Sequence, residues 1–141
     1  MTNKQSQKNK RVILKTLTCE INGDIKTVLK YLHKDYSMTW VYKRKDGVLF
    51  PSESISDLNL NEVYRIKGRA YKIKHIIAEK NVVMAELIES YPDPKKKITY
   101  RTPMVIVWEF KNGKIKNGRH YCDPQLSYEN LTREKVNKIY K

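Results

Sequence analysis

The chain has 141 residues and a mass of 16.7 kDa, which is the size of one domain. Hydrophobic residues make up 40% of it, with only five glycines and five prolines, and this composition excludes disordered and fibrous classes. The 29 Lys and Arg against 15 Asp and Glu leave a net charge of +14, so an anionic partner has to be considered.

Two cysteines, Cys19 and Cys122, are too few for a disulfide scaffold and lack the ligand spacing of a zinc site. The first eleven residues are polar and basic, and the apolar cluster that follows is broken by Lys15 and Thr16. This pattern is neither a signal-peptide core nor a membrane span. We therefore expect a cytoplasmic protein with free thiols, no bound metal and no membrane association.

The N-terminal third is predicted to be helical. Residues 1–11 are expected to form a basic flexible tail, and residues 12–21 a short helix. Asn22-Gly23-Asp24 is expected to end this helix and begin the next, with Gly23 as a left-handed C-terminal cap and Asp24 as the N-cap of the second helix. Apolar residues recur at three- and four-residue intervals from Ile25 to Tyr36, which predicts a second helix.

The rest of the chain alternates with period two, which predicts strands. Ser54 can cap one short helix between the first and second of them. Turn signals at Asp46-Gly47, residues 79–81, residues 92–94 and Asn112-Gly113 delimit five strands at about 37–42, 64–78, 82–91, 102–110 and 114–123. Helices followed by long hairpinned strands predict an α+β layout with helices on one face of an antiparallel sheet and no parallel unit.

Two segments carry a resemblance to a known superfamily. They are NGDIKTVLKYLHKDYSMTW at 22–40 and VIVWEFKNGKIKNGRHYCD at 105–123. With them, the chain from about 12 to 128 resembles the SnoaL-like, polyketide cyclase-related group of the nuclear transport factor two-like superfamily, which leaves 129–141 as a C-terminal extension. The resemblance implies a cone of curved antiparallel sheet wrapped around N-terminal helices, a pocket at its wide end and dimerisation through the outer sheet face. The fold hosts isomerases, dehydratases, cyclases, hydrolases and binding modules.

The last expected strand ends in Asp123, an acid that the resemblance favours as a general base. Alternation places Tyr121 and Asp123 on one face of residues 114–123. In the catalytic proteins that this chain resembles, an acid near this place is a general base, which requires a partly desolvated carboxylate. Asp123 is therefore the first base candidate and Tyr121 a partner, while Asp123-Pro124 is also typical of a simple turn.

Two histidines are candidates for the cavity. His120 has the opposite parity from Asp123, so both face inward only if a bulge at Gly118 shifts the strand. His75 alternates with Tyr71 on the more apolar face of its strand. We expect His75 to look into the cone, either as a catalytic partner or as a hydrogen-bonded core residue.

Glu86 and Glu89 interrupt opposite apolar faces of the strand at 82–91. A carboxylate among apolar neighbours needs a partner or has a raised pKa, so Glu86 is a further acid or base candidate. For Glu89 we favour a simpler role, in which it pairs with a basic side chain at a sheet edge or dimer interface.

Aromatic side chains are expected to shape the pocket. Trp40 and Tyr42 share one strand face, and Trp108 lies with Met104 and Ile106 on another. Rings with a polar tip suit a cavity that orients a small ligand, and they suit a core or a dimer interface equally well. The expected pocket residues are Trp40, Tyr42, Trp108 and His120.

The favoured hypothesis is a homodimeric SnoaL-like protein that binds a small apolar molecule with a carbonyl or hydroxyl group, without metal or cofactor. As an enzyme it would be a lyase or isomerase in which a pocket carboxylate moves a proton. The alternative is a non-catalytic module that binds a ligand or a protein in the same cone.

A third hypothesis is anion binding by a basic sheet face. Lys and Arg alternate with apolar residues in the segment 64–74, which would place a cationic row along one strand, suited to a phosphate backbone. Positive charge is nevertheless spread along the whole chain, and abundant Lys, Asn and Ile are typical of adenine- and thymine-rich coding. Nucleic acid is the least favoured partner.

Overall fold

The computed structural model describes residues 3–129 and 131–140. Its elements are the two 3₁₀ helices η1 and η2 and a set of α-helices and strands, in the order α1 (Asn3–Ile21), α2 (Ile25–Tyr31), β1 (Leu32–Trp40), β2 (Ser52–Ser54), α3 (Ile55–Leu60), η1 (Glu62–Arg65), β3 (Ala70–Glu79), β4 (Val82–Asp93), β5 (Ile98–Lys111), β6 (Lys114–Tyr121), η2 (Pro124–Tyr128) and α4 (Arg133–Ile139). The fold is α+β, as the order of helical and strand patterns predicts.

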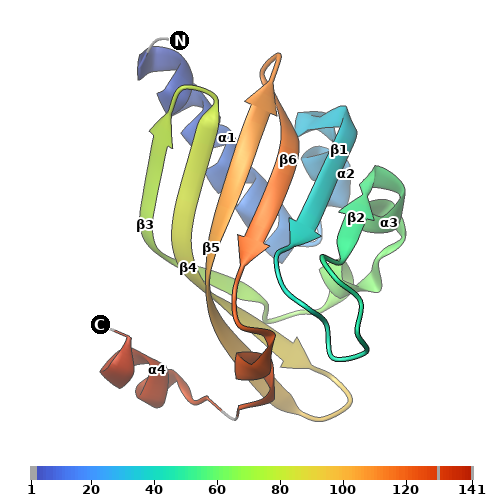
Figure 1. Ribbon diagram of the computed structural model, residues 1–141, viewed down its shortest axis with the longest axis vertical. Coiled ribbons are helices and arrows are strands. Elements are labelled where there is room, and N and C mark those ends of the chain that lie inside the picture. The colour runs from blue at the N-terminus through green and yellow to red at the C-terminus, as the bar shows by residue number, and fades with distance from the viewer. Residues whose placement is uncertain (1–2, 130, 141) are drawn as a thin grey trace.

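The strands form one curved sheet in the order β2-β1-β6-β5-β4-β3, with α1 crossing behind it (Figure 1). The hairpins β3–β4, β4–β5 and β5–β6 are antiparallel, but β1 pairs with β6 in parallel. The expectation of a wholly antiparallel sheet is therefore wrong. Turn signals report only neighbours in sequence, whereas the last strand of the sheet inserts between β5 and the first strand.

Helix α1 begins at Asn3, so the predicted flexible tail is wrong for residues 3–11, while residues 1–2 lie outside the described residues. The buried stripe of the helix continues through its polar half with Ser6 and Asn9, which are 3% and 2% exposed. Ser6 donates a hydrogen bond to the Lys80 carbonyl oxygen at 3.1 Å. Hydrophobic periodicity missed these turns because their buried side chains are polar.

Helix α2 ends at Tyr31, five residues before the predicted end at Tyr36, and the chain enters β1 at Leu32. Leu32 and Tyr36 are both buried on the concave side of the sheet. The spacing of these residues fits either a helix or a strand, since apolar side chains at even numbers also satisfy period two.

The short helix predicted after Ser54 is confirmed as α3. The Ser54 hydroxyl accepts from the Asp57 backbone N–H, and the Asp57 carboxylate accepts from the Ser54 N–H, which is a capping box. At the other end, Asn61 accepts from the Val63 N–H and so starts η1. The two caps fix β2 and η1 relative to each other at the edge of the sheet.

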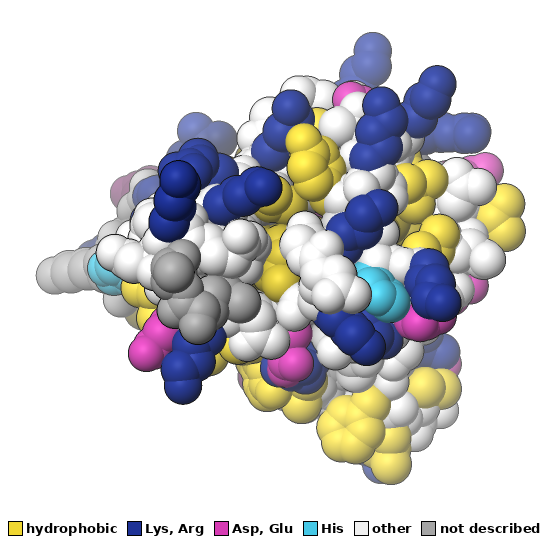
Figure 2. Space-filling view, turned by 90° about the horizontal axis from the view of Figure 1, so that it is seen from above, with side chains coloured by type: hydrophobic (Ala, Val, Ile, Leu, Met, Phe, Trp, Pro, Cys, Tyr) yellow, Lys and Arg dark blue, Asp and Glu magenta, His cyan; other side chains and the backbone are white. Residues whose placement is uncertain are grey.

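The basic row expected along residues 64–74 does not form. Residues 62–65 are 3₁₀-helical, and Arg69 is 5% exposed rather than on the surface. Lys72 and Lys74 hold the C-terminal helix through Asn137 and the Tyr140 carbonyl oxygen, each at 3.0 Å. At the end of the molecule where α1 begins, Lys and Arg side chains are scattered between apolar and neutral ones (Figure 2).

The segment predicted as a C-terminal extension folds back on the convex face of the sheet, opposite α1 (Figure 1). Val136 of α4 is 6% exposed, and the Tyr140 hydroxyl donates to Glu86 Oε2 on β4 at 2.6 Å. Ile77 and Met84 remain 64% and 40% exposed on the same convex face. Helix α4 therefore covers one part of this face and leaves an apolar part uncovered.

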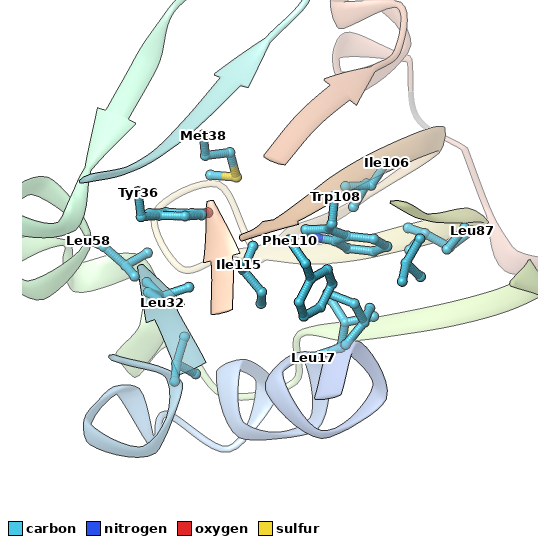
Figure 3. Packing of buried hydrophobic residues seen from close by; sticks show 14 of the residues in the cluster. Leu17, Leu32, Tyr36, Met38, Leu58, Leu87, Ile106, Trp108, Phe110 and Ile115 are labelled. Atoms are coloured by element: carbon cyan, nitrogen blue, oxygen red, sulfur yellow. The ribbon is translucent and has the colours of Figure 1, made fainter. Parts of the chain in front are cut away.

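The core fills the space between α1 and the concave face of the sheet. Ile13 and Leu17 of α1 are 0% and 5% exposed, and Leu17 lies beside Phe110 of β5 in Figure 3. Trp108 and Ile106 continue the same face of β5, with Tyr36 and Met38 of β1 across from them. Next to this packed layer, a cavity lies between α1, η1 and the concave face of the curved sheet.

Gly23 joins α1 to α2 with φ of +74°, and a Cβ there would lie 2.9 Å from the Tyr64 carbonyl oxygen. Gly47 has φ of +93° but no atom within 4 Å of such a Cβ. We expect Gly47→Ala to cost about 1 kcal/mol of unfolding free energy, and Gly23→Ala about 2–4 kcal/mol because a backbone clash adds to the left-handed conformation. Urea unfolding measures both, and equal losses would contradict a steric role for Gly23.

Candidate functional site

A cavity of about 240 Å³ lies between α1, η1 and the concave face of the sheet. Its wall is rich in aromatic and ionisable side chains and consists of Leu17, Glu20, Tyr36, Met38, Trp40, Glu53, Asn61, Val63, Tyr64, Arg69, Tyr71, Glu89, Tyr91, Ile106, Trp108 and His120. A wider hollow of about 640 Å³ next to it shares Trp40 and Glu89. We call these the inner cavity and the mouth, and Trp40 and Glu89 stand where the two meet.

Four side chains form a connected network in the inner cavity. The Arg69 Nη2 donates to the Tyr71 hydroxyl at 3.0 Å, and that hydroxyl lies 3.5 Å from Glu20 Oε2. Tyr71 pairs with Glu89 in the β3–β4 register, and the Arg69 charge and the Tyr71 hydroxyl both act to lower the pKa of the Glu89 carboxyl group. One phenol and one guanidinium therefore connect a carboxylate on α1 with a carboxylate on β4. We call this set, Glu20, Arg69, Tyr71 and Glu89, the carboxylate network.

The environment moves both acids of the network towards neutrality. Burial raises the pKa of Glu20 to about 7, with Arg69 opposing the rise and the charge of Glu89 adding to it. Burial likewise raises the pKa of Glu89, against the lowering effect of Arg69 and of the Tyr71 hydrogen bond. A pair of carboxyl groups with perturbed pKa values can hold one proton and lack another, which is the requirement for acid and base in one site.

The cavity phenols remain hydrogen-bond donors. Burial, assisted by the negative charge of Glu20 and Glu53, raises the pKa of Tyr36 and of Tyr64 far above the usual range. The pKa of Tyr71 is also raised well above its ordinary value, first by burial and then by Glu20. The Arg69 guanidinium lies 5.3 Å from the Tyr64 ring centre and 5.8 Å from that of Tyr71, so it stacks between them.

The residues predicted to shape the pocket lie in its walls. Trp40, Trp108 and His120 line the inner cavity, and Tyr42 lines the mouth. His120 is 7% exposed, and burial lowers the pKa of its imidazole to about 4, so the ring is neutral. Its ring meets Trp40 edge-on, with centres 5.6 Å apart.

Asp123 and Tyr121 do not face the cavity, which corrects their expected placement. Tyr121 is 44% exposed, and Asp123 caps η2 by accepting from the Gln125 N–H at 2.9 Å, as in the simple-turn alternative. The cause is a bulge in β6: Glu109 pairs with Asn117 and Phe110 with Ile115, so the register skips one residue. The skipped residue is Lys116, whereas the sequence predicts a possible bulge at Gly118.

His75 and Glu86 do meet, but on the convex face of the sheet. His75 Nδ1 lies 2.9 Å from Glu86 Oε1, and the His75 side chain is 77% exposed. The β3–β4 register shifts between Ile73 and His75, so Ile73 points inward and His75 outward. The expectation that His75 looks into the cone is therefore wrong, and the pair helps to hold Tyr140 of the C-terminal segment instead.

Sequence reasoning overlooked Glu20, Glu53 and Arg69 as site residues and gave Glu89 only a pairing role. For Glu20 a signal was present, since it follows Ile13 and Leu17 at helical spacing and so belongs to the buried stripe of α1. Arg69 precedes its strand, and nothing in the local pattern distinguishes it from the exposed basic residues around it.

The structure gives no indication of a metal centre or a membrane span in the described ranges 3–129 and 131–140. No cluster of three or more His, Cys, Asp or Glu side chains there is arranged to hold a metal ion. No helix in these ranges is both long and apolar enough to cross a membrane. Cys19 and Cys122 are free thiols, and burial raises the pKa of Cys122 to about 11.

No protein-family model and no curated protein sequence matches this chain. Solved structures do match it over nearly its whole length. An NTF2-like protein of unknown function from Cytophaga hutchinsonii is 15% identical, with a TM-score of 0.64 over 86% of this chain and 95% of that one. The chain has the nuclear transport factor two-like fold.

Two further solved structures match this chain over a similar share of both chains. A LEH-like epoxide hydrolase from M. tuberculosis is 22% identical, with a TM-score of 0.68 over 96% of this chain and 97% of that one. TerC, co-crystallised with polyporic acid, is 15% identical, with a TM-score of 0.72 over 87% of this chain and 97% of that one. At these identities the likeness establishes the nuclear transport factor two-like fold and no activity.

The raised pKa of Glu20 predicts a pH-dependent stability. Between its ordinary value of 4.5 and about 7, unfolded chains lose the Glu20 proton while folded chains keep it, so wild-type stability falls as pH rises through this window. The substitution Glu20→Gln removes the titrating carboxyl group and, with it, this loss of stability at higher pH. We expect the variant to gain on the order of 3 kcal/mol relative to wild type between pH 4.5 and 8.

Urea unfolding at a series of pH values measures this difference. Glu62→Gln makes the same change at an exposed position on η1 and should follow the wild-type curve. Parallel pH profiles for wild type and Glu20→Gln would show that Glu20 titrates alike in folded and unfolded chains.

Proposed function

We propose that this protein is a cofactor-free general acid–base enzyme, an isomerase or lyase acting on a small, largely apolar molecule with a carbonyl or hydroxyl group. The observation that carries the proposal is the carboxylate network. It brings two partly exposed carboxyl groups of raised pKa, Glu20 and Glu89, to one phenol and one guanidinium at a cavity of about 240 Å³. Side chains that serve only in packing do not require two carboxyl groups of raised pKa beside one cavity.

The chemistry follows from the roles available in the network. An ionised carboxylate, Glu20 or Glu89, accepts a proton from the carbon next to the substrate carbonyl. The electron pair of that C–H bond forms a C=C bond, and the π pair of the carbonyl moves onto its oxygen. Tyr64, Tyr71 and the Arg69 guanidinium donate hydrogen bonds to the developing oxyanion. Return of the proton to another carbon completes an isomerisation, and loss of a β-hydroxyl that takes up the proton as water completes a dehydration.

The comparisons agree with a small ligand in this cone. Among similar structures, one is a LEH-like epoxide hydrolase and another was co-crystallised with polyporic acid. The chief alternative, a non-catalytic binding module, is best suited by a cone without a carboxylate. Here Glu20, Glu53 and Glu89 all line the inner cavity, which favours the enzyme.

We further propose that the protein acts as a homodimer through the convex face of its sheet. Exposed apolar side chains follow one another there across neighbouring strands, where Ile77 pairs with Met84 and Val105 pairs with Tyr121. Exposed apolar pairs on one sheet face are the kind of surface that marks an interaction site. Two copies would place their cavities on opposite sides of the shared face, open to solvent.

Hydrogen–deuterium exchange tests the proposed base directly. The protein should accelerate the exchange of the α-protons of cyclohexanone in D₂O, with a rate that rises through about pH 7 as Glu20 loses its proton. Glu20→Gln should lower the protein-catalysed rate by about 10²–10⁴-fold, the usual contribution of a general base.

Proton NMR follows the exchange, and Glu62→Gln serves as the control at an exposed site. A rate no faster than that of buffer would remove the proposed function, and an equal rate in Glu20→Gln would remove Glu20 as its base.

Sedimentation equilibrium tests the dimer. Ile77→Glu places a charge in the proposed interface and should weaken association at least tenfold. Leu60→Glu changes an equally apolar residue, 79% exposed on α3 and away from the sheet face, and should leave association unchanged. A monomeric wild type, or equal effects of the two substitutions, would contradict the interface.

A further inference from the structure

A second polar region of the inner cavity lies over strand β1. In the sheet order, β6 and β5 separate β1 from the strands β4 and β3 of the carboxylate network. Glu53 on β2 pairs with Met38 of β1, and His120 on β6 pairs with Trp40 of β1. Both side chains line the inner cavity. Neighbouring strands are about 4.8 Å apart, and Met38 and Trp40 are about 6.6 Å apart along β1, so the backbones of Glu53 and His120 lie about 12 Å from each other. One small ligand group between the two side chains can span what remains of this distance.

Each of these side chains has a polar atom without a hydrogen-bond partner among the described residues. Asn61 Nδ2 donates to Glu53 Oε1 at 3.0 Å, which holds the carboxylate in place, but Glu53 Oε2 has no donor. His120 is 7% exposed, and its Nδ1 is buried with no partner. A buried polar atom left unsatisfied costs about 1–3 kcal/mol, so native proteins keep such atoms where a ligand or water completes them.

We propose that Glu53 and His120 form a hydroxyl-binding subsite, in which a ligand O–H lying over Met38 donates to Glu53 Oε2 and accepts from His120 Nδ1–H. A hydroxyl group has both a donor and acceptor lone pairs, so it satisfies the two atoms together. A carbonyl oxygen cannot donate to the carboxylate, and an ammonium group cannot accept from the imidazole. Both atoms are enclosed by protein, and the terminal torsions of Glu and His are broad, so the ligand hydroxyl reaches them by rotation of these two groups.

This inference rests on the proposed function in one respect, because the same ligand is expected to present its carbonyl to the carboxylate network. It narrows the substrate class to small hydroxylated carbonyl compounds, with the hydroxyl remote from the carbon that loses its proton. Sites that hydrogen-bond a substrate hydroxyl discriminate strongly against analogues without it, because their own buried polar groups are then left unpaired.

Three cyclohexanone probes separate the possibilities: 4-hydroxycyclohexanone, cyclohexanone itself, and cyclohexane-1,4-dione. NMR titration of the wild-type protein should give a dissociation constant for the hydroxyketone at least tenfold lower than for either of the others. Glu53→Met and His120→Phe should each abolish this preference. Glu62→Met, the matched change at an exposed position, should keep it.

A second measurement does not depend on variants that might fold poorly. The ¹⁵N resonance of His120 Nδ1 in the wild-type protein should shift on titration with 4-hydroxycyclohexanone and stay in place with cyclohexanone. Equal affinity for the three probes, or an unmoved Nδ1 resonance, overturns the subsite. If cyclohexanone exchange is still catalysed in that case, the proposed acid–base function stands; if no probe binds and no exchange occurs, both proposals fall.

Discussion

A guanidinium enclosed at the centre of the fold organises the cavity. Arg69 is 5% exposed and donates through Nη1 to the Glu20 carbonyl oxygen at 3.3 Å, so it caps the C-terminal turn of α1. Through Nη2 it fixes the Tyr71 hydroxyl. A buried cation requires negative charge around it, and Glu20 and Glu89 supply that charge. The contacts that attach α1 to β3 thus hold the two carboxyl groups together, while burial raises their pKa values and Arg69 limits the rise.

Two irregularities in the sheet decide which side chains meet this network. The register shift after Ile73 turns His75 to the convex face, and the bulge before Asn117 brings His120 to the concave one. A one-residue shift moves every later side chain of a strand to the opposite face. Bulges often occur beside active sites, where they re-aim a side chain, and here they separate the chemistry of the two faces.

The two faces of the sheet therefore have different tasks. On the convex face, Glu86 receives hydrogen bonds from Tyr140 and His75, which lower the pKa of its carboxyl group. On the concave face, Glu53 on β2 and His120 on β6 are separated in the sheet order by β5 from Glu89 on β4, and aromatic rings line the same cavity. This arrangement suits a ligand with two polar ends and an apolar middle.

The sequence by itself determined the class of the fold, the Ser54 cap, the hairpins and the aromatic residues of the cavity, because these depend on periodicity and turn chemistry within short segments. It did not determine which carboxyl group is the candidate base. Glu20 continues the buried stripe of α1 in the sequence, but only the tertiary structure places it beside Arg69 at the cavity and leaves Asp123 in a turn. The physical reason is that a pKa and the face of a bulged strand depend on neighbours distant in sequence, which periodicity does not record.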